Sequence, residues 1–488
     1  MADAATASET AGQRAIANTA LRATGEIIGK LASLVLFAVM ARELGATGLG
    51  KFVFGLAFLQ IAMVPVEFGF DRYLLRRVAK DRASVNELFF DVLSLKLVLT
   101  VPLFALVTVV LLVAGYDDQT REVVWLLAIG FVLDALANTI HSLFLALERG
   151  GLLASVVIVQ RLAAAAMGLA VLAAGYGVVA VAATYSAGAA IGLAMAATLL
   201  IRRIGLPRRS VSVGGWRRLT AVSLPFGLQD VFTVILFKVD AVILSLMATE
   251  AAVGRYGGAY RLLEATFFIT FALTGAFAPM YTYLDRDSEP TVQAAFERSL
   301  KLALAGLVPI AAVFGLLAEP VSRLFFGAGL EDAADPLRFL APVIFLTGIV
   351  TLASSLIVSR RNPMVMVWAT AAVVVLNVTL NIVLIPVWEE TGAAVAMLVS
   401  EVAFLFVVGP IAAEAAGGVR WLPTITGPLL AGAAMVPLLI LLNGVPLAAV
   451  AVAVAAYAVA LTIIERLVAP ADVALAMRMA RRWLPSSG

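Results

Sequence analysis

The chain contains no cysteine, one histidine and few charged residues. Without cysteine, disulfides and thiol chemistry are excluded. Because His141 is the only histidine, few residues could ligate a metal or form a catalytic triad. Only 14% of the 488 residues are charged, against about 25% in soluble domains. Because 62% of the residues are hydrophobic, a soluble fold is excluded and a membrane protein is predicted.

Long uncharged segments predict an all-α integral membrane protein with about fourteen transmembrane helices. The runs 97–116, 339–359 and 362–388 are each long enough to cross a bilayer once. The uncharged run 162–201 is interrupted at Gly175-Tyr176-Gly177, which predicts two helices and a tight turn. The predicted spans are 27–41, 52–70, 88–114, 123–147, 151–174, 178–201, 221–247, 257–281, 300–318, 338–358, 364–387, 391–411, 424–442 and 446–464.

The distribution of basic residues predicts the orientation. With both termini cytoplasmic, the inner segments carry 24 of the Lys and Arg residues and the outer loops carry 6, as the positive-inside rule requires. Residues 1–20 lack the apolar core of a signal peptide and are expected to form a cytoplasmic tail. We therefore expect a multi-pass protein of the inner (cytoplasmic) membrane, with membrane lipids and no nucleic acid among its partners.

An internal repeat predicts the domain organisation. The segments Gly50-Lys51-Phe52 and Gly254-Arg255-Tyr256 match at an offset of 204 residues. We expect two pseudo-symmetric six-helix bundles, 21–205 and 219–412, joined by the basic linker 206–218. A helix pair at 423–464 and a cytoplasmic tail at 465–488 would follow. Parallel repeats of this kind enclose the central cavity of alternating-access transporters.

Four basic residues within the spans are candidate ligands of an anionic substrate. A charge at mid-membrane costs about 2.5 to 3.5 kcal/mol, so each should be paired or face water. The four are Lys30, Arg161, Lys238 and Arg261. A cavity that they line would suit a pyrophosphate. Two alternatives stay open, because Glu26 can pair with the first of them and Glu264 with the last.

Acidic and polar groups within the spans are candidates for charge balance or ion coupling. These are Asp240, Glu264, Glu401, Asp134 and His141. Asp134, Asn138 and His141 share one helical face, which favours either hydrogen bonds between helices or a proton relay. Glu401 has no local partner in the sequence.

Three further polar residues are expected to play other parts. Asn377 and Asn381, four residues apart, should bond to a neighbouring helix. Glu67 lies close to the predicted cytoplasmic end of its span, and we expect it to be solvated.

Several motifs resemble one family of transporters. They include Val239-Asp240, the Val253-Gly254-Arg255-Tyr256 segment, and an Asn-rich helix from Asn377 to Pro386 that is followed by Gly392-Ala393-Ala394. On these residues the chain resembles polysaccharide-unit flippases of the multidrug/oligosaccharidyl-lipid/polysaccharide exporter superfamily. The resemblance implies two bundles arranged as a V that opens inward and outward.

The resemblance also implies a function. Such a protein is a transporter and not an enzyme. It moves polyprenyl-pyrophosphate-linked oligosaccharides from the inner to the outer leaflet for cell-surface polysaccharide export. It has no cofactor beyond possible coupling to Na⁺ or H⁺, and it works beside polysaccharide polymerases and glycosyltransferases. Arg261 looks like the cavity arginine of related peptidoglycan-precursor flippases, although the Arg-Asp pair of their first helix is absent from Val35-Leu36-Phe37-Ala38-Val39.

Two alternatives remain. An ion-coupled multidrug or cation antiporter of the same superfamily should have an acid-dominated cavity. A membrane polysaccharide polymerase or ligase typically needs a large external loop, and the longest external segment here, 319–337, is too short to be a domain.

Overall fold

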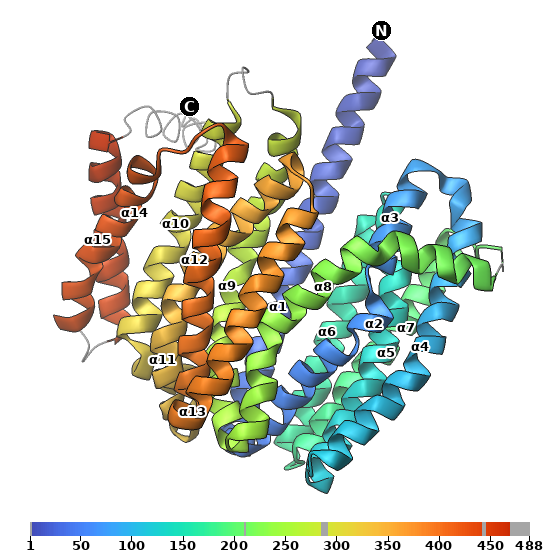
Figure 1. Ribbon diagram of the computed structural model, residues 1–488, viewed down its shortest axis with the longest axis horizontal. Helices are drawn as coiled ribbons and strands as arrows, with labels where there is room; N and C mark the ends of the chain where they lie inside the picture. The colour runs from blue at the N-terminus through green and yellow to red at the C-terminus, as the bar shows by residue number, and fades with distance from the viewer. Residues whose placement is uncertain (1, 209–210, 285–290, 442–445, 469–488) are drawn as a thin grey trace, which may run out of the picture. The chain divides into compact units, whose positions relative to one another are not determined.

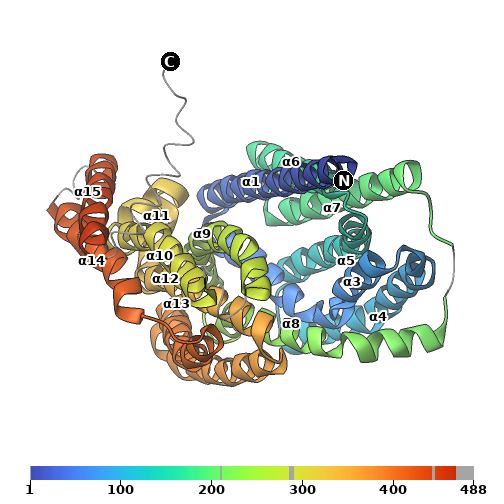
Figure 2. The same ribbon diagram turned by 90° about the horizontal axis from the view of Figure 1, so that it is seen from above.

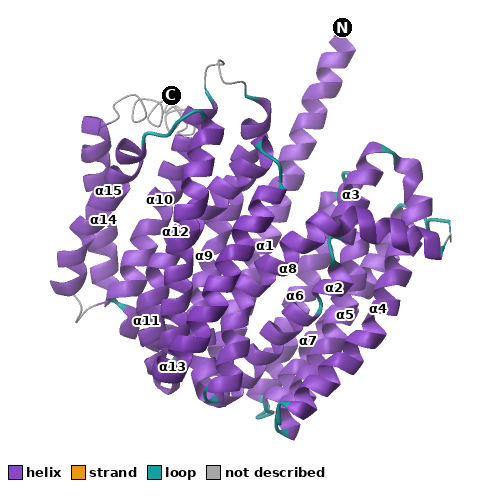
Figure 3. Cartoon of the chain, in the orientation of Figure 1, coloured by secondary structure: helices purple, strands orange, loops and turns teal. Residues whose placement is uncertain are grey.

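The computed structural model describes the backbone of residues 2–208, 211–284, 291–441 and 446–468. Within these ranges the regular structure is entirely helical, as Figure 3 shows. This confirms the all-α class predicted from the uncharged runs.

The helices follow one another through short connections (Figure 1). They are α1 (Ala2–Ala62), α2 (Val64–Glu67), α3 (Phe70–Lys80), η1 (Arg82–Ser84), α4 (Val85–Val113), α5 (Asp118–Ala146), α6 (Gly150–Ala173), α7 (Val178–Arg203), α8 (Val213–Met247), α9 (Glu250–Tyr283), α10 (Val292–Leu316), α11 (Ala318–Phe326), η2 (Ala328–Ala333), α12 (Ala334–Arg360), α13 (Met364–Ala416), α14 (Trp421–Leu441) and α15 (Pro446–Val468).

The number of spans agrees with the sequence prediction. Eleven helical segments of the described chain are long and apolar enough to cross a membrane. Two of them, in α1 and α13, each join two helices across a bend, at Gly45 (φ 65°) and at Glu389 (φ 45°). When these are separated and the 35-residue α8 is added, the described part of the chain has fourteen helices of spanning length.

The second predicted span is too long at its C-terminal end. It was expected over 52–70, but α1 ends at Ala62 and the short α2 follows. Pro65 lies in the first turn of α2, where its missing N–H is tolerated. Gly69 then adopts a left-handed conformation (φ 72°) and caps α3. This break is important because it shapes a polar cavity described below.

The predicted extramembrane segments are partly helical. The expected tail 1–20 belongs to α1 from Ala2 onward. The end of the expected linker starts α8, because the Ser212 side chain caps the helix by accepting the backbone N–H of Gly215 at 2.9 Å. Residues 209–210 of the linker and 469–488 of the predicted C-terminal tail lie outside the described residues.

The chain divides into two compact units. The first comprises Met1–Gly258, Phe326–Leu330 and Thr370–Ala393, and the second comprises the remaining residues. In the first unit, α5 lies beside α7 and α1 lies beside α6 (Figures 1 and 2). One apolar core joins Leu74 of α3, Phe89 of α4, Phe144 of α5 and Leu200 of α7.

Within the first unit, the two glycines of the sequence repeat lie at a reciprocal helix crossing. A Cβ placed on Gly50 would lie 1.9 Å from the carbonyl oxygen of Glu250, and one on Gly254 would lie 1.9 Å from that of Ala46. Ala46 and Glu250 are themselves separated by the repeat offset of 204 residues. Such exchange of equivalent contacts is what a two-fold axis produces, so the crossing lies on the pseudo-symmetry axis of these segments.

Two basic residues next to the crossing bind acidic groups. The Lys51 Nζ lies 2.5 Å from an Asp117 carboxylate oxygen and 3.6 Å from one of Glu250. Burial acts to raise the pKa of Asp117, but hydrogen bonds from Lys51 and Thr120 outweigh it and hold that pKa below its ordinary value. Arg255, at the repeat position of Lys51, binds Glu390 through two nitrogen atoms.

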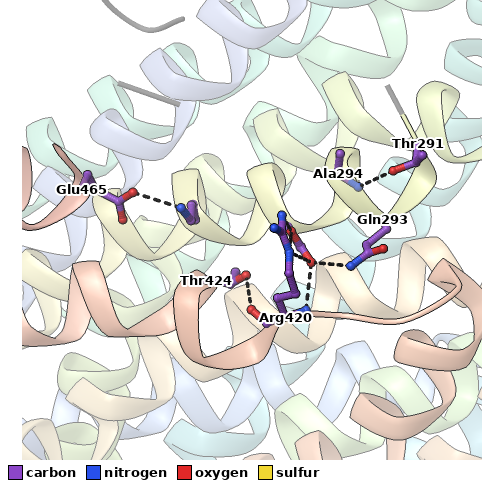
Figure 4. A network of polar contacts seen from close by, with 8 residues as sticks. Thr291, Gln293, Ala294, Arg420, Thr424 and Glu465 are labelled. Atoms are coloured by element: carbon purple, nitrogen blue, oxygen red, sulfur yellow. Dashed lines mark hydrogen bonds and ion pairs between the residues drawn. The ribbon is translucent and has the colours of Figure 1, made fainter. Parts of the chain in front are cut away.

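In the second unit, polar contacts fix the last helices to α10. Arg420 binds the Glu297 carboxylate through its guanidinium, at 2.6 Å for the shortest contact, and through its backbone N–H at 2.8 Å (Figure 4). Lys301 and Glu465 form a second pair at 3.0 Å, with both side chains largely buried. These pairs attach α14 and α15 to α10.

We predict that Gly50→Ala and Gly254→Ala each lower the melting temperature of the purified protein in detergent. The added methyl group collides with a backbone carbonyl, and overpacking of this kind costs about 1 to 3 kcal/mol. Gly214→Ala is the matched control, because a Cβ there meets open space and alanine favours a helix. Equal melting temperatures for all three variants would contradict the close crossing.

Candidate functional site

The first unit contains a cavity of about 400 Å³, which we call the first-unit cavity. Its lining comes from the end of α1, the α2–α3 break, and one face each of α5 and α8. The lining residues are Gln60, Met63, Val64, Glu67, Gly69, Asp71, Arg72, Phe131, Asp134, Asn138, Asp230 and Val234. The break after Ala62 brings three charged side chains to the cavity within six residues of the chain. Four of the lining residues are carboxylates and one is an arginine.

A buried lysine holds two of these carboxylates. The Lys96 side chain, from α4, is 1% exposed. Its Nζ lies 2.6 Å from an Asp71 oxygen and 3.1 Å from a Glu67 oxygen, and it donates to the Ala135 carbonyl at 2.8 Å. Thr139 donates to the second oxygen of Asp71 at 2.9 Å. One ammonium group therefore forms ion pairs with two carboxylates that come from different helices.

The other two lining carboxylates have separate partners. Asp134 accepts hydrogen bonds from Gln160 at 2.6 Å and from the Tyr185 hydroxyl at 2.8 Å, and both of these donors are neutral. Asp230 of α8 forms an ion pair with Arg72 of α3 at 2.7 Å. The Arg72 side chain is 55% exposed and that of Asp230 is 24% exposed, so this pair is accessible while Lys96 is not.

A second polar cluster in the first unit surrounds Asp240. This residue is 1% exposed and accepts hydrogen bonds from the Tyr256 hydroxyl at 2.8 Å and from Asn381 at 2.7 Å. Asn381 also contacts Asn377. The expected role of the two asparagines, bonding to a neighbouring helix, is thus confirmed: they join α13 to α8.

The four candidate cations lie in different places. Lys30 on α1, Arg161 on α6 and Lys238 on α8 belong to the first unit and lie outside the lining of its cavity. The Arg161 side chain runs across Gly29 of α1 and interacts electrostatically with Asp134. Arg261 belongs to the second unit, where its guanidinium pairs with Glu264 at 2.8 Å. The pairing of these last two residues, one of the expected alternatives, is confirmed.

The candidate acidic and polar groups differ in their surroundings. Asp134 lines the first-unit cavity, with Asn138 one turn further along α5. His141 is buried, and its Nε2 has no hydrogen-bond partner among the described residues. In the second unit, Glu401 is 2% exposed and one of its carboxylate oxygens likewise lacks a partner in the described chain.

One ion pair and several residues were missed. Glu67 was expected to be solvated, and its side chain is 34% exposed, but its carboxylate also binds Lys96. Sequence reasoning did not single out Lys96, Asp71 or Asp230. A signal was present, since Glu67 and Asp71 are four residues apart and the following span carries a lysine.

Comparison with known proteins identifies the family. A model of the family described as "Polysaccharide biosynthesis protein" matches residues 15–284, more than half of the chain. The chain belongs to this family. The membership confirms the resemblance seen in the motifs. One relative is the probable low-salt glycan biosynthesis flippase Agl15 of Haloferax volcanii. It is 24% identical over 366 residues, which cover 74% of this chain and 75% of that protein.

Solved structures share the fold of this polysaccharide biosynthesis family member. The lipid II flippase MurJ in an inward closed conformation has a TM-score of 0.73 at 13% identity, over 91% of this chain and 99% of that one. An inward-facing multidrug resistance transporter of the MATE family has a TM-score of 0.65 at 16% identity, over 79% of this chain and 95% of that one. Both likenesses concern the fold.

We predict that Lys96→Met strongly destabilises the protein. The change leaves the largely buried Asp71 and the partly exposed Glu67 without their cation, and removing one partner of a buried ion pair costs about 3 to 5 kcal/mol. The measurement is thermal unfolding in detergent. The triple variant Lys96→Met with Glu67→Gln and Asp71→Asn should recover most of the loss. Arg323→Met, in an exposed pair with Glu331, should change the melting temperature little, because exposed ion pairs contribute little to stability. Similar losses in Lys96→Met and Arg323→Met would contradict the role of Lys96.

Proposed function

We propose that the protein is a flippase that moves polyprenyl-pyrophosphate-linked oligosaccharides from the inner to the outer leaflet by alternating access. The observation that carries the proposal is a ligand-sized cavity, lined by apolar and charged side chains, inside a membrane-spanning fold of the polysaccharide biosynthesis family. The relative from Haloferax volcanii and the structural neighbour MurJ are both named as flippases, which supports this function.

The physical task fits the distribution of polar groups. A polyprenyl tail can stay in the lipid during transfer, whereas the pyrophosphate and the sugars cannot enter the bilayer core without polar partners. A transporter for such a cargo needs cations for the phosphates and hydrogen-bonding groups for the sugars. The described chain provides both kinds of group within its spans.

In this proposal, Arg261 binds the pyrophosphate with the help of Lys238, Arg161 and Lys30. A guanidinium binds phosphate oxygens in a bidentate way. In the structure Arg261 pairs with Glu264, so the carboxylate holds the guanidinium in place and keeps its charge balanced until the phosphates arrive. Glu264 is therefore proposed as a charge-balancing residue.

We propose that the energy comes from a Na⁺ or H⁺ gradient, coupled through Asp240, Glu401, Asp134 and His141. Asp240 supports this best, because it is buried, its hydrogen bonds come from a tyrosine hydroxyl and asparagine side chains, and Lys238 interacts with it electrostatically. Carboxylate and amide oxygens are ligands that hard cations prefer. Glu401 supports it through burial of a carboxylate oxygen that lacks a partner in the described chain.

The setting that we propose is the inner membrane, with both termini cytoplasmic. The excess of basic residues in alternate loops supports this orientation. Glycosyltransferases would complete the lipid-linked unit on the cytoplasmic side, and a polymerase would use it on the other side. The protein itself is proposed to make or break no covalent bond.

A second candidate function is an ion-coupled antiporter of organic cations. The four carboxylates of the first-unit cavity favour it, since such a lining suits a cation. The fold shared with MATE transporters is compatible with it. The family match supports the flippase instead, and the experiments below separate the two functions.

We predict that deleting the gene causes the lipid-linked oligosaccharide to accumulate while surface polysaccharide is lost. The measurement is mass spectrometry of extracted lipids. The wild-type gene should restore both, and Arg261→Glu should not, because it places a negative charge beside the phosphates. Arg338→Glu makes the same change in an exposed i,i+3 pair and should restore both. Unchanged lipids together with new sensitivity to cationic drugs would favour the antiporter.

We predict that Asp240→Asn abolishes the dependence of transport on its coupling ion. Transport by the purified wild-type protein in liposomes should be faster with an inward Na⁺ or H⁺ gradient than without one. The variant, which keeps the shape of the side chain but loses its charge, should transport at the rate without a gradient. Asp335→Asn, at an exposed position, is the control. A gradient response that survives in Asp240→Asn would refute this assignment.

A further inference from the structure

We propose that the first-unit cavity binds a sugar ring of the cargo and selects sugars without negative charge, that is, neutral hexoses or amino sugars and not uronic acids. This inference rests on the proposed flippase function. It adds a substrate class and a place for the sugar, and it is argued from the lining of the cavity.

The size and the mixed lining fit a sugar. A volume of about 400 Å³ falls within the roughly 300 to 1,000 Å³ of small-molecule sites. Phe131, Met63 and Val234 give the cavity an apolar side, and carboxylate, amide and guanidinium groups give it a polar side. A sugar ring has the same division, because its C–H groups form apolar faces and its hydroxyls project from the edges. An aromatic ring can pack on such a face.

The polar groups have hydrogen-bonding capacity to spare. An ionised carboxylate offers about four acceptor positions. Glu67 is engaged in the structure by Lys96 at 3.1 Å, by Asn138 at 3.3 Å and by the neighbouring Asp71 carboxyl group. Asp230 is engaged through one oxygen, by Arg72. Sugar hydroxyls can donate to the remaining positions, while the Gln60 and Asn138 amides can donate to sugar oxygens.

The charges of the lining determine which sugars fit. Glu67 and Asp71 share the single ammonium of Lys96. Asp134 accepts hydrogen bonds from neutral donors and interacts electrostatically with Arg161, and Asp230 pairs with Arg72. Four lining carboxylates therefore face three cations. A sugar carboxylate placed here would meet like charges, which costs several kcal/mol and is screened little away from bulk water. The ammonium of an amino sugar would be attracted instead.

The same charges exclude the pyrophosphate from this cavity. Two phosphate groups beside four carboxylates would be repelled more strongly than one uronic acid. The two polar parts of the cargo therefore require different surroundings, and the first-unit cavity provides the one suited to the sugar.

The test compares three lipids in liposomes that contain the purified full-length protein. Each lipid is a short-chain polyprenyl pyrophosphate with one sugar: a hexose, an unacetylated hexosamine or a hexuronic acid. The rate of flipping is measured as the rate at which the sugar becomes accessible to a membrane-impermeant oxidant. We expect the hexose and hexosamine lipids to flip at least about tenfold faster than the hexuronic acid lipid.

Two independent variants locate the selection in the cavity. Glu67→Gln and Asp230→Asn each remove one negative charge with little change of shape, and each should raise the relative rate for the hexuronic acid lipid severalfold. The second change also frees Arg72 to bind a carboxylate. Asp118→Asn is the matched control, because its side chain is 90% exposed at the start of α5 and outside the cavity. It should leave the ratio of rates unchanged.

The outcomes separate this inference from the function on which it rests. Equal rates for the three lipids would overturn the charge selection and leave the flippase function standing. A ratio unchanged in both cavity variants would show that the sugar binds elsewhere and would overturn the site. If folded protein flips none of the three lipids, the proposed function fails, and this inference fails with it.

Discussion

In the first unit, the ammonium group of Lys96 meets carboxylates from α2 and α3 and a carbonyl group from α5. The ammonium and the carboxylates could not remain unpaired inside a membrane, because an unpaired buried charge costs several kcal/mol. Their mutual attraction therefore holds α2, α3, α4 and α5 in one arrangement. The rest of the site depends on this contact, since it fixes the direction in which the broken helix presents its side chains.

The break between α1 and α3 explains why a cavity forms at that place. Backbone that leaves the helical conformation loses internal hydrogen bonds, and at membrane depth this is tolerated only where the backbone is buried in protein or lines a water-filled space. Pro65 and the left-handed Gly69 interrupt the helix. Both the irregular backbone and the charged side chains around it then need polar surroundings, and the first-unit cavity provides them.

The sequence allowed the spans to be predicted better than the site. Each span needs about 20 apolar residues, so uncharged runs predict the helices, and the repeat predicted the relation between Gly50 and Gly254. Hydropathy is insensitive to a break inside an apolar run, so the end of α1 was misplaced. Asp134 could be found because its polar neighbours lie on the same helical face. Lys96 was missed because its partners lie 25 and 29 residues away on other elements, and the spacing of Glu67 and Asp71 does not by itself name the residue that binds them.

The acidic cavity taken alone favours a cationic substrate and the cationic candidates favour an anionic one, but a single cargo can account for both. A lipid-linked saccharide combines a strongly anionic pyrophosphate with sugars that need hydrogen bonds and not charge. If all the binding groups were cationic, they would attract the pyrophosphate. They would repel the sugars only if the sugars also carried positive charge. Where the sugars are neutral or basic, carboxylates can serve as hydrogen-bond acceptors for hydroxyls while arginine and lysine side chains elsewhere bind the phosphates. In the proposed flippase, the carboxylates of the first-unit cavity would accept hydrogen bonds from neutral sugars and Arg261 of the second unit would bind the phosphates, whereas an antiporter of organic cations would need only the carboxylates.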